Sequence, residues 1–325
     1  MSATVAADSI LRELSEMWMS LGKQGESATG VLRACSLTLV VLAAEDDDSS
    51  ALGETLAALM PQHPARTIVI RLKGNEPPAA RVTAQCWMPF GQRRQICCEQ
   101  IEITAAEDAL EDVAWVVSPI AAPDLPLVLW CRCPRVVENA DFGHLGARAT
   151  KVLVDTADWP DARAAARKLA GLAARGLTLG DFSWTRLTRW REMLSQVFEN
   201  PRYAGRLSEI SRVRVVFGGD NATVLALYMG AWVVDAMASS GIRGELILEP
   251  DPSLSAAQLS RVELDGPGFR VELARQQERL VVTVDGLSQC TSLSTASDYV
   301  LASEELEILR RDPVFEHALV AAARM

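Results

Sequence analysis

The sequence has 325 residues, of which 49% are hydrophobic and 23% are charged, and its formal net charge is −10. This length suits one large domain or two ordinary ones, and the composition excludes wholesale disorder because it supplies enough apolar surface for a core. The acidic balance makes the chain a poor electrostatic partner for the phosphates of a nucleic acid or for an anionic membrane.

The chain lacks an apolar stretch long enough to cross a bilayer. Its longest charge-free apolar-rich stretch, residues 221–234, has about 14 residues, whereas a membrane span needs about 20. The N-terminus carries Asp8, Arg12 and Glu13 before any long apolar run, which argues against a secretory signal and indicates a short amphipathic helix. We therefore expect a cytoplasmic protein.

The N-terminal half alternates predicted strands with predicted helices. Strands are expected at residues 35–43, 66–72, 81–88, 95–104, 127–131 and 151–154. One helix is expected at 49–60. A second is expected to begin at a capping box formed by Thr104 and Glu107, and a third to run from Pro160 to Gly176. Helical crossovers between strands indicate an α/β layer fold, and the adjacent strands within 81–104 indicate a mixed sheet.

The C-terminal half begins near Asp181 with a predicted helix. Helices are expected at residues 182–199, 221–239, 297–310 and 313–323. Strands are expected at 212–217, 245–249, 259–264, 269–274 and 280–284, and the last three alternate as a meander. The sequence thus predicts a Rossmann-like mixed-sheet α/β domain over residues 1–178. A second α/β domain, α+β-like with a β-meander and terminal helices, is predicted over residues 179–325.

The sequence shows none of the common catalytic or metal-binding patterns. Its three histidines, His63, His144 and His317, have no second ligand at metal-binding spacing, and there is no HExxH, GxSxG or Walker lysine loop. We expect no catalytic residue, no cofactor and no metal.

One glycine turn lies between a predicted strand and a predicted helix. Gly218 and Gly219 could face a phosphate at the start of that helix, but they lack the GxGxxG spacing. An ordinary tight turn, in which Asp220 or Asn221 caps the helix, is the favoured interpretation.

Seven cysteines, an odd number, do not indicate a disulfide scaffold. Cys35, Cys86 and Cys290 are interpreted as small buried hydrophobic residues. Adjacent side chains on a strand point to opposite faces, so we expect either Cys97 or Cys98 to lie nearer to solvent.

The adjacent cysteines are also the candidate redox residues. Arg93 and Arg94 could lower the pKa of a thiol if they fold back over Cys97 or Cys98, although plain packing is the favoured interpretation. Cysteines at 97, 98, 131 and 133 could form a four-sulfur zinc site on paper, but they lack the usual CxxC spacing.

A tryptophan-rich helix is predicted over residues 184–199. Its apolar arc consists of Trp184, Leu187, Trp190, Leu194, Val197 and Phe198. Arg191 falls inside this arc, where an unpaired guanidinium is costly. It either pairs with a carboxylate of its own domain, which we favour, or reaches a protein interface with Trp184 and Trp190.

Three segments form distinctive motifs: GQRRQICCEQI at 91–101, DFSWTRLTRWRE at 181–192 and ASEELEILRRD at 302–312. They resemble the glucose-6-phosphate dehydrogenase assembly protein (OpcA) family. The second is long and unusual, although the chain has Arg189 where that family often has proline, and Cys131 where it often has a second tryptophan.

The resemblance implies a non-enzymatic partner that promotes the assembly or allosteric activation of glucose-6-phosphate dehydrogenase in the oxidative pentose phosphate pathway. It places candidate interface residues in the first two motifs: Arg93, Arg94, Gln95, Glu99, Gln100, Trp184, Arg186, Trp190 and Arg191. The rival hypotheses are a sugar-phosphate or nucleotide-binding enzyme of Rossmann-like fold and a thiol redox sensor.

Overall fold

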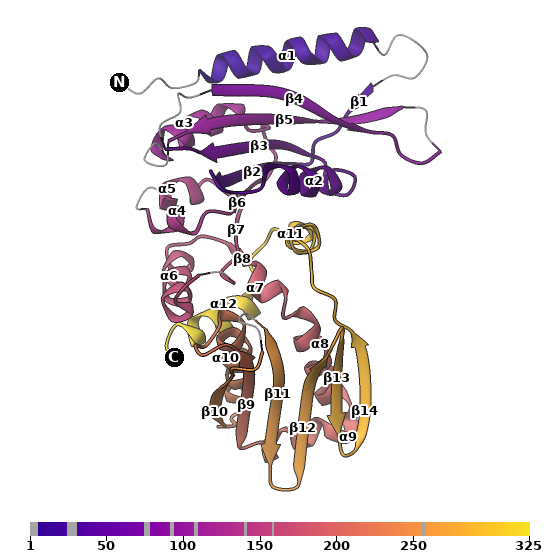
Figure 1. Cartoon of the computed structure of the whole chain (residues 1–325), viewed down its shortest axis with the longest axis vertical. Helices are drawn as coiled ribbons and strands as arrows, with labels where there is room; N and C mark the ends of the chain where they lie inside the picture. The colour runs from indigo at the N-terminus through magenta and orange to yellow at the C-terminus, as the bar shows by residue number, and fades with distance from the viewer. Residues whose placement is uncertain are drawn as a thin grey trace. The chain divides into compact units, whose positions relative to one another are not determined.

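The computed structural model describes residues 6–24, 31–74, 79–91, 94–106, 110–139, 142–157, 159–254 and 258–325. Internal contacts group the chain into two compact units (Figure 1): Met1–Val154 with Asp298–Arg310, and Asp155–Ser297 with Arg311–Met325. The C-terminal segment that joins the first unit lies outside the predicted 1–178 domain. The two predicted domains, as units that fold independently, stay a prediction.

The first unit is built around a sheet whose buried strands are parallel. Its strands are β1 (Val31–Arg33), β2 (Leu37–Ala44), β3 (Ala65–Leu72), β4 (Ala79–Trp87), β5 (Gln95–Ala105), β6 (Leu127–Cys131) and β7 (Lys151–Val154). They lie in the order β1-β5-β3-β2-β6-β7, and β4 adds an antiparallel edge on β5. Counted from β2, the order β5-β3-β2-β6-β7 reads 3-2-1-4-5, as in dinucleotide-binding folds. The Rossmann-like mixed sheet is confirmed.

Helices cover both faces of this sheet (Figure 1). They are α1 (Ala7–Gln24), α2 (Ser49–Leu59), α3 (Leu110–Ile120), α4 (Pro134–Glu138), α5 (Phe142–Gly146) and α11 (Asp298–Glu307). Helix α1 contacts α3 and β4, whereas α11 contacts α2. Strand β2 is buried along its whole length, because its eight residues face helices on both sides.

The second unit contains the predicted meander and extends it. Its strands are β8 (Leu179–Asp181), β9 (Arg212–Gly218), β10 (Glu245–Asp251), β11 (Leu259–Gly266), β12 (Phe269–Gln276), β13 (Arg279–Val284) and β14 (Leu287–Ser292). One sheet has the order β10-β9-β11-β12-β13-β14, in which β9 and β10 are parallel and the other pairs are antiparallel.

The helices of the second unit are α6 (Ala162–Ala174), α7 (Phe182–Thr185), α8 (Thr188–Glu199), α9 (Pro201–Ala204), α10 (Val224–Ser239) and α12 (Pro313–Ala322), with a 3-10 turn at Gly205–Glu209. Helices α6, α10 and α12 contact one another. Gly266 ends β11 where a Cβ would lie 1.8 Å from the carbonyl oxygen of Glu209, so only glycine fits there.

Several local predictions are wrong. Thr104 lies inside β5 and therefore caps no helix, while Glu107 lies outside the described residues. Helix α6 begins after Asp161, whose carboxylate accepts hydrogen bonds from the first turn. The single helix expected at 182–199 is two helices, α7 and α8. None of the helices among the described residues is both long and apolar enough to cross a membrane.

A buried carboxylate joins four elements of the first unit. Glu99 of β5 contacts Arg66 of β3, Arg33 of β1 and the indole N–H of Trp18 on α1. The Arg66 guanidinium also donates to the carbonyl of Ile120. Because Glu99 and Arg66 are both buried, each charge depends on the other for compensation.

We expect Glu99→Gln to destabilise the fold by about 3–5 kcal/mol, because it leaves the Arg66 charge buried without its counter-ion. Glu102→Gln is the matched control: it lies on the same strand and also contacts two arginines, but its side chain is 29% exposed. That control should change the free energy of unfolding by less than about 1 kcal/mol. Urea unfolding measures both, and equal effects would contradict the assignment.

Candidate functional site

The carboxyl end of the first unit's sheet is the place where folds of this topology bind nucleotides. The strand order reverses between β2 and β6, and ligands bind in the crevice outside such a reversal. Here β2 is followed by the acidic residues 45–48, and β6 is followed at once by Arg132. The chain therefore puts carboxylates where a phosphate-binding loop has glycines.

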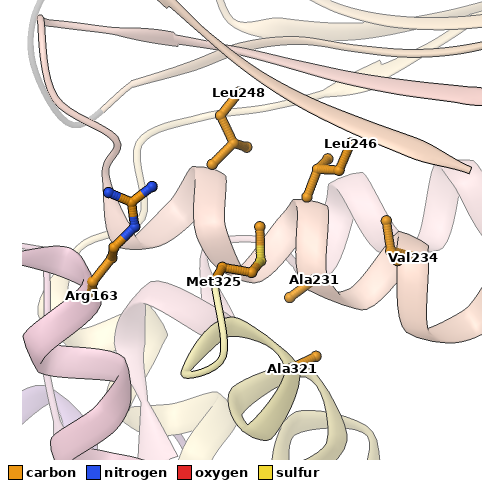
Figure 2. Close-up of a pocket in the computed structure, with 7 residues that line it drawn as sticks. All are labelled: Arg163, Ala231, Val234, Leu246, Leu248, Ala321 and Met325. Carbon is orange, nitrogen blue, oxygen red and sulfur yellow. The ribbon is translucent and has the colours of Figure 1, made fainter.

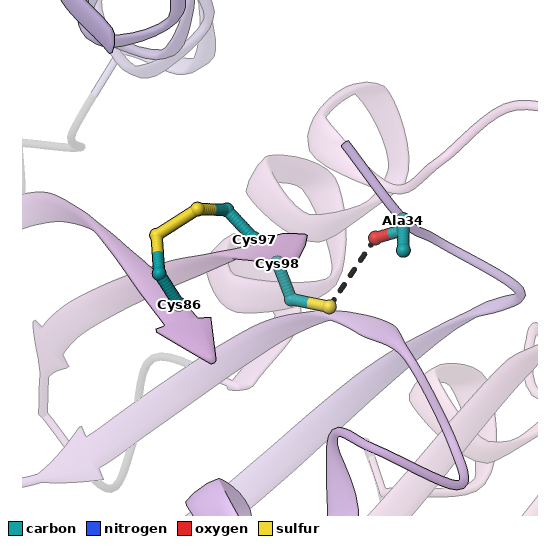
Figure 3. The surroundings of a disulfide bond; sticks show 4 residues. All are labelled: Ala34, Cys86, Cys97 and Cys98. Atoms are coloured by element: carbon teal, nitrogen blue, oxygen red, sulfur yellow. Dashed lines mark hydrogen bonds between the residues drawn. A yellow bond between two sulfur atoms is a disulfide. The ribbon is translucent and has the colours of Figure 1, made fainter. Parts of the chain in front are cut away.

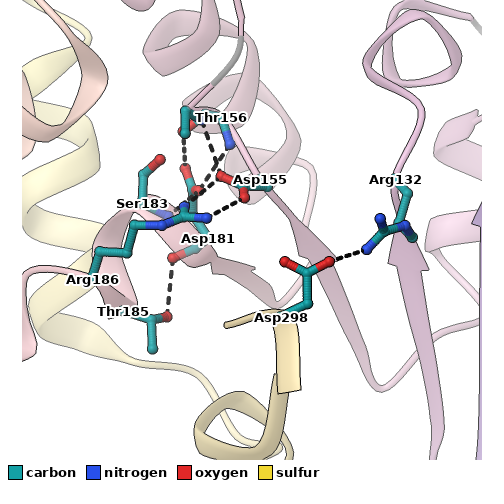
Figure 4. A network of polar contacts seen from close by, with 9 residues as sticks. Arg132, Asp155, Thr156, Asp181, Ser183, Thr185, Arg186 and Asp298 are labelled. Atoms are coloured by element: carbon teal, nitrogen blue, oxygen red, sulfur yellow. Dashed lines mark hydrogen bonds and ion pairs between the residues drawn. The ribbon is translucent and has the colours of Figure 1, made fainter. Parts of the chain in front are cut away.

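Arg132, at the end of β6, forms ion pairs with two carboxylates of the same unit. Its guanidinium donates two hydrogen bonds to Asp47, at 2.5 and 2.9 Å, and one to Asp298 of α11 at 2.5 Å (Figure 4). It also lies over the ring of Trp130, 4.9 Å from the centroid. Burial opposes the charge, yet the hydrogen bonds to Asp47 and Asp298 raise the pKa of Arg132.

The helix that would present its N-terminus to a pyrophosphate is already capped. Asp48 accepts hydrogen bonds from the backbone N–H groups of Ser50 and Ala51 at the start of α2. Its carboxylate thus occupies the donors that an anion would use, and it adds negative charge beside them. This end of the sheet is unsuited to a nucleotide phosphate.

The second family-like motif begins at a buried carboxylate in the second unit. Asp181 accepts hydrogen bonds from the hydroxyls of Thr156 and Tyr228, at 2.6 and 2.9 Å, and from the backbone N–H of Ser183 (Figure 4). Burial raises the pKa of Asp181 to about 6 and also raises the pKa of Tyr228. Asp181 is therefore the N-cap of α7 and a polar anchor inside the core.

Trp184 of that motif is buried inside the second unit. Its ring contacts Phe315, with centroids 5.5 Å apart, and its indole N–H donates to Asp312 at 3.0 Å. The Arg191 guanidinium lies over the same ring, 3.7 Å from its centroid. Trp184 is thus the part of this motif that anchors the interior of the second unit, whereas Arg189 and Glu192 are exposed.

The candidate interface residues of this motif differ in burial. Trp184 and Trp190 are buried, whereas Arg186 and Arg191 are half-buried. Arg186 makes two hydrogen bonds of 2.7 Å to Asp155. Arg186 and Leu187 separate α7 from α8, so the one continuous helix predicted over residues 184–199 is wrong, although Trp184 is buried as its place on the apolar arc predicts. A role of these residues in partner binding stays a prediction.

The candidates of the first motif lie on or beside β5. Arg94 and Gln95 are exposed, Gln100 is half-buried and Glu99 is buried in the ion cluster described above. Arg93 lies outside the described residues. Of this set, Arg94 and Gln95 are the described residues most accessible to a partner.

The cysteines differ from the expectation in three respects. Cys86 of β4 and Cys97 of β5 stand opposite each other and form a disulfide (Figure 3). Cys98 is buried as well, so neither neighbour lies near solvent, and its thiol donates to the carbonyl of Ala34. Cys290, expected to be buried, is exposed, while Cys35 is partly exposed.

These contacts change the redox hypothesis. Burial raises the pKa of Cys98 to about 11, which is the opposite of activation by a nearby arginine. Any redox couple on this strand pair is therefore Cys86 with Cys97. The described residues contain no group of histidine, cysteine and acidic side chains that could hold a metal ion.

The glycine turn and one pocket of the second unit offer no catalytic set among the described residues. Helix α10 starts at Val224 and is capped by Thr223, not by Asp220 or Asn221. A pocket of about 450 Å³ (Figure 2) is lined by Arg163, Ala231, Val234, Leu246, Leu248, Ala321 and Met325. Arg163 is the charged residue of this otherwise apolar lining, which lacks a nucleophile and a general base.

Sequence reasoning missed Asp47, Arg132 and Asp298. The available signal was an acidic run directly after one buried strand and an arginine directly after another. Nothing in the sequence links Asp298 to either of them, because it lies 166 residues beyond Arg132.

Two domain descriptions of one family, "Glucose-6-phosphate dehydrogenase subunit", match the chain. Residues 56–171 match the N-terminal domain of that family, and residues 177–319 match its C-terminal domain. Together they cover most of the sequence, so the chain belongs to this family, the OpcA family of glucose-6-phosphate dehydrogenase assembly proteins.

Curated relatives are cyanobacterial proteins named OxPP cycle protein OpcA. That of Synechocystis sp. is 25% identical over 195 residues, which are 59% of this chain and 40% of the relative. The Nostoc punctiforme protein is 25% identical over 179 residues, which are 54% of this chain and 38% of that relative. The matches therefore span less than half the length of these relatives.

Solved structures with a similar fold include oxidoreductases at low identity. A biliverdin reductase from Synechocystis sp. has 12% identity and a TM-score of 0.45, covering 88% of this chain and 97% of its own. A 3-ketoreductase from Actinomadura kijaniata has 12% identity and a TM-score of 0.44, covering 90% and 94%. Likeness at this level carries no argument about activity.

The raised pKa of Asp181 gives stability a pH dependence. The folded carboxyl, with a pKa of about 6, binds its proton more tightly than the unfolded one at 3.8. Its contribution to the free energy of unfolding is therefore complete below about pH 4 and is lost as the pH rises through about 6, by about 3 kcal/mol in all.

Asp181→Asn should remove this dependence. The free energy of unfolding of the wild type, minus that of the variant, should fall between about pH 4 and 6. Urea unfolding measures both. Asp161→Asn is the control: backbone hydrogen bonds lower the pKa of that exposed helix cap, so its effect lies below about pH 4 and its difference from wild type should stay nearly flat between about pH 4 and 6. A difference for Asp181→Asn that stays flat across this window would contradict the assignment.

The thiols should react in three classes with an alkylating probe. Without reductant, Cys290 should react fast because it is exposed, and Cys98 slowly because it is buried with a raised pKa. Cys86 and Cys97 should react only after reduction. Mass-spectrometric mapping reads this out, and rapid labelling of Cys97 in the unreduced native protein would disprove the pairing.

Proposed function

We propose that this chain is a non-enzymatic partner that assembles and activates glucose-6-phosphate dehydrogenase, acting as an allosteric effector. Family membership supports this proposal, since both halves of the chain match descriptions that name this dehydrogenase. The curated relatives carry the name of the OxPP cycle, and the chain matches part of their length. A cytoplasmic location accompanies the proposal as a prediction.

The observation that supports the non-enzymatic part is the set of ion pairs at the carboxyl ends of β2 and β6. Arg132, the cation at the strand-order reversal, is bound by Asp47 and Asp298 and is not free for a phosphate. The Asp48 cap repels an anion from α2. A Rossmann-like sheet whose strand ends are bound by its own side chains serves as a scaffold and does not bind a nucleotide.

The mechanism we propose is a shift of population between states of the dehydrogenase. A partner that binds the active oligomer more tightly than the inactive forms raises the active fraction by its difference in affinity. It needs no bond-making group, only a surface complementary to one state. A tenfold preference corresponds to about 1.4 kcal/mol, which a few well-packed side chains supply.

The test measures dehydrogenase activity and particle size with and without this chain, using the glucose-6-phosphate dehydrogenase of the same organism. We expect a higher rate together with a shift in sedimentation toward a complex. Heat-unfolded chain at equal concentration is the control for nonspecific protein effects. No change in either property would refute the proposal.

The chain alone should not oxidise glucose 6-phosphate with either nicotinamide cofactor, because Arg132, the cation at the strand-order reversal, is bound by Asp47 and Asp298 and an acidic cap occupies the start of α2. Titration with NADP should likewise show no saturable binding. Turnover by a preparation shown to be free of the dehydrogenase would favour the rival, a sugar-phosphate or nucleotide-binding enzyme.

A further inference from the structure

One edge of the second unit's sheet, strand β14, is open to pairing with a further strand (Figure 1). Five of its six residues are exposed. The stretch 286–297 contains no charged residue, although 23% of the whole chain is charged. Proteins usually protect an edge strand against pairing with charges, proline or a bulge. Strand β14 has neither charge nor proline, and its register with β13 is unbroken.

The hairpin that contains β14 fixes which of its backbone groups point outward. A two-residue turn at 285–286, with positive φ at both residues, joins β13 to β14. The residues that flank such a turn, Val284 and Leu287, exchange both backbone hydrogen bonds, and bonding then alternates along the strand. The outward-facing N–H and C=O groups therefore belong to Ser288, Cys290 and Ser292. Among the described strands β14 pairs with β13 alone, so these groups have no strand partner.

The other edge of the same sheet, β10, is protected. It carries Glu245, Glu249 and Asp251, together with Pro250, which has no N–H to donate. If two copies paired antiparallel about Leu248, Glu245 of one copy would oppose Asp251 of the other, and like charges directly opposite each other are destabilising. The two edges of one sheet thus differ, and β14 is the edge suited to pairing.

The sequence of β14 is complementary to itself when it is reversed about Cys290. An antiparallel pair of two copies centred there brings Cys290 opposite its counterpart, and Ser288 of each copy opposite Ser292 of the other. These are the residues whose backbone groups point outward, so every outward N–H on one strand meets a C=O on the second strand. The register therefore bonds all the backbone groups that β13 leaves open.

The side chains on the other face of β14 match in the same register. Gln289 of one copy opposes Thr291 of the other, and Leu287 opposes Leu293. Leu293 continues the alternation of the strand, because its N–H donates to the carbonyl of Glu278. Leu287 is 60% exposed in the single chain. Apolar side chains thus meet apolar ones and polar side chains meet polar ones.

We propose that two copies of this chain associate through β14 about a twofold axis, which joins their sheets into one continuous sheet. Such a contact is isologous, as in most homodimers. A single strand buries little surface, so the dimer is weak and dissociates on dilution. The charge of −10 opposes encounter at long range, but at physiological salt it is screened beyond about 8 Å and the contacting segment is uncharged.

The first test exchanges charges across the pair. Wild type should form reversible dimers in sedimentation velocity over a range of concentrations. Ser288→Asp combined with Ser292→Asp places like charges opposite each other and should weaken dimerisation by about tenfold, and the corresponding lysine pair should do the same. An equimolar mixture of the aspartate and lysine chains should restore dimers, because each aspartate then faces a lysine. Both serines are exposed, so each variant should keep the wild-type melting temperature.

The matched control adds the same charge away from the edge. Gln276→Asp combined with Gln277→Asp alters two exposed residues at the turn between β12 and β13. Because these residues lie outside the proposed contact, this variant should change the dimer dissociation constant by less than about twofold at physiological salt.

The second test reads the register with a short bifunctional maleimide, which alkylates two thiols and needs no oxidant. Cys290 should crosslink to Cys290 of the second copy, as peptide mapping identifies. On a Cys290→Ser background, chains with Ser288→Cys should crosslink to chains with Ser292→Cys. Chains with Ser288→Cys should not crosslink to one another, because the two copies of position 288 lie about 13 Å apart along the strands.

The outcomes decide the pairing without the dehydrogenase. A wild type that stays monomeric at every concentration, or a dimer that the aspartate pair leaves unchanged, would overturn it. If the wild type alone is monomeric and the aspartate pair weakens binding to the dehydrogenase, β14 pairs with a strand of that enzyme, which also overturns the assignment. Failure of the dehydrogenase assays refutes the proposed function and leaves the β14 dimer standing, since the dimer is measured on the chain alone.

Discussion

Arg132 binds Asp47 and Asp298 at the strand ends where folds of this topology bind a ligand. It joins the ends of β2 and β6 to α11, which comes from near the end of the chain. Lys151 strengthens the same attachment by pairing with Glu305 and donating to the carbonyl of Ile308. These ion pairs hold the ends of β2 and β6 to α11 with the chain's own charges.

The two family-like motifs divide between surface and interior. The motif at 181–192 supplies Asp181, Trp184 and Arg186, whose partners all lie within the second unit. The motif at 91–101 starts beside an exposed turn and continues into a buried strand. The part of each motif that packs explains stability, and the exposed part of the first is where a partner can reach the chain.

A binding role and a filled crevice are consistent with each other. The Rossmann-like order of strands persists because it is a stable way to bury parallel strands between helices, whatever its loops carry. Acidic residues follow β2 at the place where a glycine loop would face a phosphate, and their negative charge disfavours an anion there.

The sequence alone determined the α/β class, most strands and the meander, because alternating and continuous apolar runs report local burial directly. It also contained the family motifs, whose residues need no structure to be read. Only the tertiary structure decided that Cys86 faces Cys97, that Trp184 belongs to a separate short helix, and that Asp298 reaches Arg132. These are contacts between residues distant in the chain, or breaks in helical phase. Both are set by how the elements pack in three dimensions, which a local sequence pattern does not reveal.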